Sequence, residues 1–265
     1  MTSEILYQQP AVLVAAVLIG LMLLGAELGY RIGRRGRATN TELTRIQIIS
    51  IQGSTMGLLA LLLGFTFSMA LSRFECRKQM VVLESNAIGT AVLRAQFLPE
   101  AHANEINTLA CRYVEIRLES VLSTCQGSPE RDKLDVEDHK IQLRLWRIAN
   151  EAAGANPQSG PLGLLVDAVN ELIDIKMQRD VAVANHVPES VLVFLLAFSV
   201  VAAIVLGYGN GLAGARIMGL TGAYGLIVVL VVMLIIDLDH PQQGLARTSQ
   251  DSMLQLERML ETPRP

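Results

Sequence analysis

The segment GLLALLLGFTFSMALSRFE, residues 57–75, decides the fold of this chain. It is apolar enough to lie in lipid, yet the polar side chains of Thr66 and Ser68 stand inside it, beside Phe65 and Phe67. The segment is therefore either a plain membrane anchor or a helix with one face that lines something. The rest of the sequence narrows that choice.

The composition of the whole chain is that of a membrane protein. Of its 265 residues 51% are hydrophobic and only 18% are charged, whereas about a quarter of the residues of a soluble domain are charged. The apolar residues collect in four blocks, two near each end, with a polar middle that is typical of a water-facing insert. No long basic tract suggests a nucleic acid partner.

Each apolar block is long enough to form a helix across the bilayer, which takes about 20 residues for a core of about 30 Å. The blocks cover residues 11–30, 48–71, 189–208 and 217–236. No series of alternating ten-residue segments indicates a membrane β-barrel. The sequence predicts an all-α polytopic membrane protein with four transmembrane helices and a helical extramembrane insert between helices two and three.

The first block resembles a signal peptide in position but not in its flanks. A cleaved signal peptide has positive charge before a shorter apolar run. Here residues 1–10 hold no Lys or Arg, and the arginines follow the block. We therefore expect a retained helix.

Proline and glycine mark the boundaries between segments. Pro188 suits the first turn of the third membrane helix, and Pro99 precedes a new helix in the insert. The breaker-rich stretches 124–129 and 155–161 predict loops. The expected divisions are a first helix pair, the insert, a second helix pair and a C-terminal amphipathic helix or tail, at 1–71, 72–187, 188–240 and 241–265.

Arginines in the short loops set the expected orientation in the inner membrane. The third loop holds Arg216 and the N-terminal tail holds no basic residue, which places both short loops in the cytoplasm and the insert outside it. Arg73, Arg77 and Lys78 follow the second helix and oppose this assignment, but long inserts cross regardless of charge. The first loop holds Arg31, Arg34, Arg35, Arg37 and Arg45.

One face of the second membrane helix is small or polar at its ends and hydrophobic in its middle. Turned toward a common axis by several subunits, it would form polar vestibules around an apolar constriction, which can gate a pore by dewetting. Alternatively, the serines bond to backbone carbonyls and the face packs on another helix. At steps of three and four residues the face consists of Ser54, Gly57, Leu61, Phe65, Ser68 and Ser72.

Glycines recur at the spacing that lets membrane helices approach closely. One ladder is Gly25, Gly29 and Gly33, and a second set is Gly219, Gly222 and Gly225. The motif GNGLAG, residues 209–214, matches a dinucleotide fingerprint, but that motif works between a strand and a helix. After a membrane helix it predicts a turn and close packing, and we expect no cofactor.

Few residues suggest other chemistry. Asp237, Asp239 and His240 end the fourth helix, where they could bind a cation or simply mark the membrane interface. Cys111 and Cys125 could pair in an oxidising compartment or stay as thiols. The sequence shows no paired metal-ligand histidines, phosphate-binding loop or nucleophile elbow, so we expect neither a metal site nor an enzyme.

Four stretches together resemble the bacterial membrane proteins of the bestrophin-like domain family. They are ALLLGFTFSMALSRFE (60–75), LESNAIGTAVLRAQFLP (83–99), CRYVEIRL (111–118) and DLDHPQQGL (237–245). The resemblance implies kinship to bestrophins, which are pentameric anion channels with a pore lined by the second membrane helix and narrowed by apolar side chains. Leu61 and Phe65 are then candidates for the neck.

The resemblance also implies a homo-oligomer, possibly a pentamer, that passes small inorganic ions such as chloride through the lipid bilayer. The bestrophin arrangement places the insert in the cytoplasm, against the arginine count. The acidic calcium site of the animal channels has no evident match, so no calcium site is expected. The alternative function is a non-conducting membrane scaffold or sensor whose insert binds a protein partner.

Overall fold

Every element of the protein that the structure describes is a helix. The computed structural model describes residues 11–37, 41–122, 129–214, 216–239 and 248–261, and no strand occurs in these ranges. The all-α prediction is confirmed. The elements are α1 (Ala11–Gly36), α2 (Glu42–Arg94), the 3-10 turn η1 (Ala95–Phe97), α3 (Glu100–Leu122), α4 (Pro129–Ala155), α5 (Gly160–Ala184), α6 (Glu189–Ala213), α7 (Met218–Asp239) and α8 (Asp251–Glu261).

Among the described residues, four helical stretches are long and apolar enough to cross a membrane, which confirms the predicted number. They contain α1, α2, α6 and α7. The second apolar block ends at Leu71, but α2 continues without a break to Arg94. No proline interrupts the sequence before Pro99, and 53 residues rising 1.5 Å each make a helix about 80 Å long.

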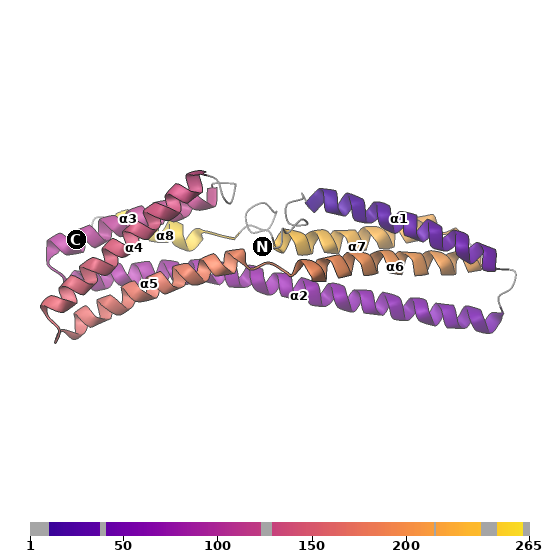
Figure 1. Ribbon diagram of the computed structural model, residues 1–265, viewed down its shortest axis with the longest axis horizontal. Helices are drawn as coiled ribbons and strands as arrows, with labels where there is room; N and C mark the ends of the chain where they lie inside the picture. Colours follow the sequence, from indigo (N-terminus) through magenta and orange to yellow (C-terminus); the bar gives the residue numbers. More distant parts are fainter. Residues whose placement is uncertain (1–10, 38–40, 123–128, 215, 240–247, 262–265) are drawn as a thin grey trace. The chain divides into compact units, whose positions relative to one another are not determined.

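The chain divides into two compact units. The first is Met1–Arg73 with His186–His240, and it contains α1, α6, α7 and the first part of α2. The second is Phe74–Asn185 with Pro241–Pro265, and it contains the rest of α2 with α3, α4, α5 and α8. Among the described helices α2 alone contributes residues to both units, and Figure 1 shows it as one continuous helix.

Backbone-to-backbone packing joins α1 and α6 in the first unit. A Cβ placed on Gly29 would lie 2.8 Å from the Tyr208 nitrogen and nearer still to the Ile204 carbonyl oxygen, and Gly207 faces the Ala26 backbone in the same way. Such distances leave no room for a side chain, so the predicted role of the first glycine ladder is confirmed.

The glycines of α7 behave differently. Gly219 and Gly222 have open space within 4 Å, and Gly225 meets only the end of the Met22 side chain at 4.0 Å. The prediction of close helix packing at these three positions is therefore not met within the described part of a single chain.

The second unit has a hydrophobic core formed by its helices. Apolar side chains at helical spacing on α3 and α5 lie in it, and α8 buries the apolar face of an amphipathic helix against it. The hydroxyl of Ser85 on α2 donates a hydrogen bond to the Ser252 carbonyl of α8 at 3.0 Å. Core side chains include Ile106, Tyr113, Ile116, Leu165, Val169, Leu172, Met253, Leu256 and Leu260.

A buried carboxylate organises charged side chains inside this core. Glu84 on α2 is 0% exposed. The Tyr113 hydroxyl donates to its Oε1 at 2.7 Å, and the Arg117 Nε lies 3.0 Å from the same oxygen. The Arg179 guanidinium pairs with the other oxygen. Burial, and next the Glu84 charge, raise the pKa of Tyr113 well above its usual value, so the phenol stays protonated.

A second buried carboxylate lies beside this group. Asp138 on α4 is buried, with the Lys176 Nζ 3.4 Å away and the Arg117 guanidinium 4.0 Å away. Burial raises the pKa of Asp138, and the two cations oppose that shift. Four helices, α2, α3, α4 and α5, thus contribute charges that meet inside the second unit.

Replacing Gly29 with alanine tests the packing of α1 on α6. In an open helix this change gains up to about 1 kcal/mol, but here the new methyl group overlaps the α6 backbone, and overpacking costs about 1–3 kcal/mol or more. We expect Gly29→Ala to lower the thermal unfolding midpoint in detergent. Gly222→Ala, with open space around it, should leave the midpoint unchanged or raise it. Equal midpoints for the two variants would contradict the packing.

Replacing Glu84 with glutamine tests the buried charges. Arg117 and Arg179 would lose their carboxylate in the core, which costs about 3–5 kcal/mol, or a midpoint lowered by roughly 2–4 °C per kcal/mol. The matched control is Glu115→Gln, which removes a carboxylate from an exposed pair with Arg112 and should cost at most about 1 kcal/mol. A loss no larger than that of the control would show that Glu84 does not hold the core together.

Candidate functional site

The face of α2 predicted to line a pore is uncovered along its whole length in the single chain. Leu61 is 53% exposed and Phe65 is 64% exposed, although both are large apolar side chains. The other four positions, Ser54, Gly57, Ser68 and Ser72, are exposed as well.

The opposite face of α2 is packed within the first unit. At 3.6 residues per turn, Leu59, Thr66 and Ala70 lie about half a turn from Leu61. They are 1%, 4% and 0% exposed. The Thr66 hydroxyl donates to the Leu62 carbonyl at 2.8 Å. Its polar group is thus satisfied inside the helix, on the covered side.

Two long polar side chains attach this covered face of α2 to backbone carbonyls elsewhere in the first unit. The Gln52 amide donates to the Val205 carbonyl at 3.0 Å and to the Leu206 carbonyl at 3.3 Å, both on α6. The Arg73 guanidinium donates to the His186 carbonyl at 2.6 Å. Sequence reasoning missed Gln52, although its position seven residues before Leu59 puts it on the same stripe.

Arg77 has a similar role in the second unit. It is nearly fully buried and donates to the carbonyls of Ala182 at 3.1 Å and Asn185 at 2.9 Å, at the end of α5. A guanidinium at a helix C-terminus satisfies carbonyls that have no partner in the helix. Arg73 and Arg77, two of the three basic residues that opposed the arginine count, are thus contact groups as well as charges.

The acidic residues at the end of α7 make specific contacts. The buried Asp239 carboxylate accepts a hydrogen bond from the Val187 backbone N–H at 3.0 Å, and its Oδ2 lies 3.4 Å from the His186 Nδ1. Asp237 is half-buried, and His240 lies outside the described residues. In the described ranges, no three His, Cys, Asp or Glu side chains group closely enough to hold a metal ion.

The GNGLAG motif lies in the last turns of α6 and not between a strand and a helix. Gly209 faces the Gln52 side chain and Gly211 faces the Tyr30 backbone. Gly214 ends the helix in the left-handed region with φ 70°, a conformation that glycine adopts at no steric cost. The motif therefore serves helix packing and a turn.

The cysteine pair is described only in part. Cys111 lies on α3 beside the core of the second unit. Cys125 lies outside the described residues, so the pairing of the two thiols stays a prediction.

Comparisons with solved structures show the fold. A point mutant of a bacterial Bestrophin homolog from Klebsiella pneumoniae matches with a TM-score of 0.64 at 16% identity, covering 94% of this chain and 97% of that one. A second crystal structure of the Klebsiella pneumoniae homolog has a TM-score of 0.64 at 17% identity and covers 91% and 96%. No curated protein matches the sequence.

The family comparison covers most of the chain. The family model of the Bestrophin-like domain matches residues 16–253, which include three of the candidate membrane spans, all but the first five residues of the N-terminal one, and the helical segment between the second and third. This match also contains the residues on which the sequence resemblance was based. The chain therefore belongs to the bestrophin-like family of membrane proteins.

Proposed function

We propose that this protein is a homo-oligomeric ion channel whose pore is lined by the exposed face of α2. One observation carries the proposal. Leu61 and Phe65 lie in the middle of an apolar helix, and each is more than half exposed, while the opposite side of the helix is packed against α6. An exposed stripe that is polar at both ends is better suited to water than to lipid.

The chemistry of the stripe fits a pore with a dry centre. The hydroxyls of Ser54 toward one end and of Ser68 and Ser72 toward the other can hydrogen-bond to water or ions. Leu61 and Phe65 offer no polar atom to replace lost hydration water, so a ring of them holds ions back. The stripe carries no charged side chain, so selection there depends on the ease of dehydration.

The ion and the subunit number follow from kinship in this proposal. Bestrophins are anion channels and pentamers, so chloride and a pentamer are the proposed ion and assembly. Serine hydroxyls at the two vestibules can donate hydrogen bonds to an anion. A non-conducting scaffold would use the same exposed face of α2 for helix packing between subunits, and flux separates the two functions.

Truncation of Phe65 tests the neck. Phe65→Ala should widen the apolar ring and admit water, so the flux of anions into liposomes should rise or its ion selectivity should loosen. The matched control is Leu230→Ala on α7, also an exposed apolar residue in a membrane span, which should change neither.

The scaffold function predicts different results for the same proteins. Phe65→Ala would then weaken subunit packing and lower stability, with no flux before or after the change. Background leakage from the wild type and both variants, with each protein shown to be folded and oligomeric, would refute the channel.

Orientation is a separate part of the proposal. We place the two short loops in the cytoplasm and the insert, residues 72–187, outside it, from the arginines of the first loop and Arg216. A reporter of cytoplasmic location fused after Arg37 should be active, and the same reporter fused near Gly127 should be inactive. The reverse pattern would show the bestrophin arrangement, with the insert in the cytoplasm.

A further inference from the structure

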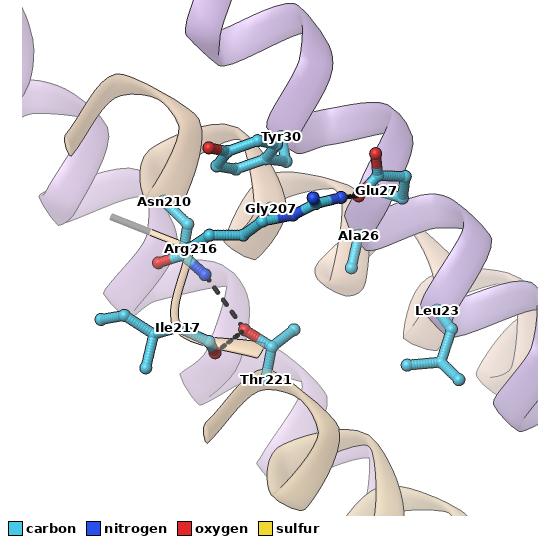
Figure 2. Close-up of a pocket in the computed structure, with 9 residues that line it drawn as sticks. All are labelled: Leu23, Ala26, Glu27, Tyr30, Gly207, Asn210, Arg216, Ile217 and Thr221. Atoms are coloured by element: carbon cyan, nitrogen blue, oxygen red, sulfur yellow. Dashed lines mark hydrogen bonds and ion pairs between the residues drawn. The ribbon is translucent and has the colours of Figure 1, made fainter. Parts of the chain in front are cut away.

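A cavity of about 190 Å³ opens at one end of the first unit, between α1, the end of α6 and the loop into α7. Figure 2 shows Arg216 extending from this loop to Glu27 on α1, with the Tyr30 ring beside its guanidinium. Water takes up about 30 Å³ per molecule, so the space holds a group as large as several waters, such as a phosphodiester.

Glu27 and Arg216 line the polar end of the cavity, and together with Arg31, which lies beside the lining, they form a group with a net positive charge. The Arg216 guanidinium donates to Glu27 Oε2 at 2.6 Å, and the Arg31 Nε donates to Oε1 at 2.8 Å. Two guanidinium groups thus share one carboxylate, and one positive charge remains uncompensated within the group. An anion placed here would be attracted.

Arg216 is held in place but retains free donor capacity. Its guanidinium carbon lies 5.3 Å from the centre of the Tyr30 ring, a cation–π distance. The side chain is 52% exposed, and a guanidinium has five N–H donors in a fork that fits phosphate oxygens. Beside it, the Asn210 amide donates to the Thr221 hydroxyl at 3.1 Å, which closes the wall of the cavity.

The apolar end of the cavity points along the membrane-spanning helices. Leu23 lies one turn before Glu27 on α1, farther from the loop, and Ala26 and Gly207 form the wall between them. The cavity is therefore polar at the loop end of the span and apolar toward its middle. A lipid in one leaflet is arranged in the same way, with its polar headgroup at the membrane surface and its apolar chains toward the middle.

We infer that this cavity binds an anionic phospholipid, with its phosphodiester on Arg216 and the start of an acyl chain over Leu23 and Ala26. A basic group between membrane helices at the interface is a recognised setting for such headgroups. A zwitterionic lipid carries no net charge, so it would not neutralise the uncompensated positive charge. A soluble phosphate would leave the apolar half of the cavity unfilled. The inference does not depend on ion conduction.

Native mass spectrometry of the purified full chain in detergent tests this site. The protein is titrated with equal amounts of phosphatidylglycerol and phosphatidylcholine, and the lipid retained per chain is counted. The wild type should retain phosphatidylglycerol in preference. Arg216→Gln removes a charge-assisted contact, so its affinity for phosphatidylglycerol should fall roughly tenfold or more.

Two controls identify the source of the binding. Arg45→Gln removes an equal charge from the start of α2, from a residue that does not line the cavity, and should bind like the wild type. Excess glycerol 3-phosphate, which has the headgroup chemistry without the acyl chains, should not displace the lipid. Displacement by it would show a site for a soluble anion and overturn the inference.

A second variant keeps the test sound if Arg216→Gln does not fold. Ile217→Glu places a carboxylate at a half-exposed loop position of the cavity wall, where it cancels the uncompensated charge and should lower phosphatidylglycerol retention similarly. Equal retention of phosphatidylglycerol by the wild type and a folded variant, or equal retention of both lipids by the wild type, would refute the site.

Discussion

The backbones of α1 and α6 touch, and no side chain can stand between them. Glycines on both helices make this possible, because Gly29 faces the Ile204 carbonyl and Gly207 faces Ala26. Contact at this distance replaces the hydrophobic effect, which gives helices no reason to associate within lipid. It also brings the ends of the two helices together, so that Tyr30 and Asn210 wall the same cavity.

Helix α2 is held by side-chain hydrogen bonds and ion pairs, whereas α1 and α6 are held by backbone contact. In the first unit it is fastened by polar side chains to carbonyls, Gln52 to α6 and Arg73 to His186. In the second unit its Glu84 forms ion pairs with the guanidinium groups of Arg117 and Arg179. One side of the helix therefore makes contacts within its own chain. The side with Leu61 and Phe65 remains available for water, lipid or another copy.

Much of this fold could be read from the sequence. Four apolar runs of about 20 residues predict four membrane-spanning helices. The glycine spacing on α1 predicts which side of that helix packs against another helix. The periodicity of α2 places the six candidate pore residues on one face, since 3.6 residues per turn fixes which side chains share a face, and their lining of a pore stays a prediction. Glu84 and Arg179 could not be predicted, because charged residues on a polar helix look like a solvated face. Only the packing of α2, α3 and α5 against one another shows that Glu84 and Arg179 lie in the core.

The unbroken length of α2 restricts how its sequence can vary in evolution. Within each unit its covered residues keep one phase: Leu59 and Thr66 in the first unit are seven residues apart, as are Arg77, Glu84 and Ala91 in the second, and all of them are buried. Seven residues make nearly two turns, so the stripe drifts by only about 20° per step. A single residue inserted between Arg77 and Glu84 would rotate the residues after it by about 100°, exposing Glu84 if the Arg77 contacts held. Insertions or deletions of about seven or eleven residues, nearly two or three whole turns, would keep this phase within about 20°.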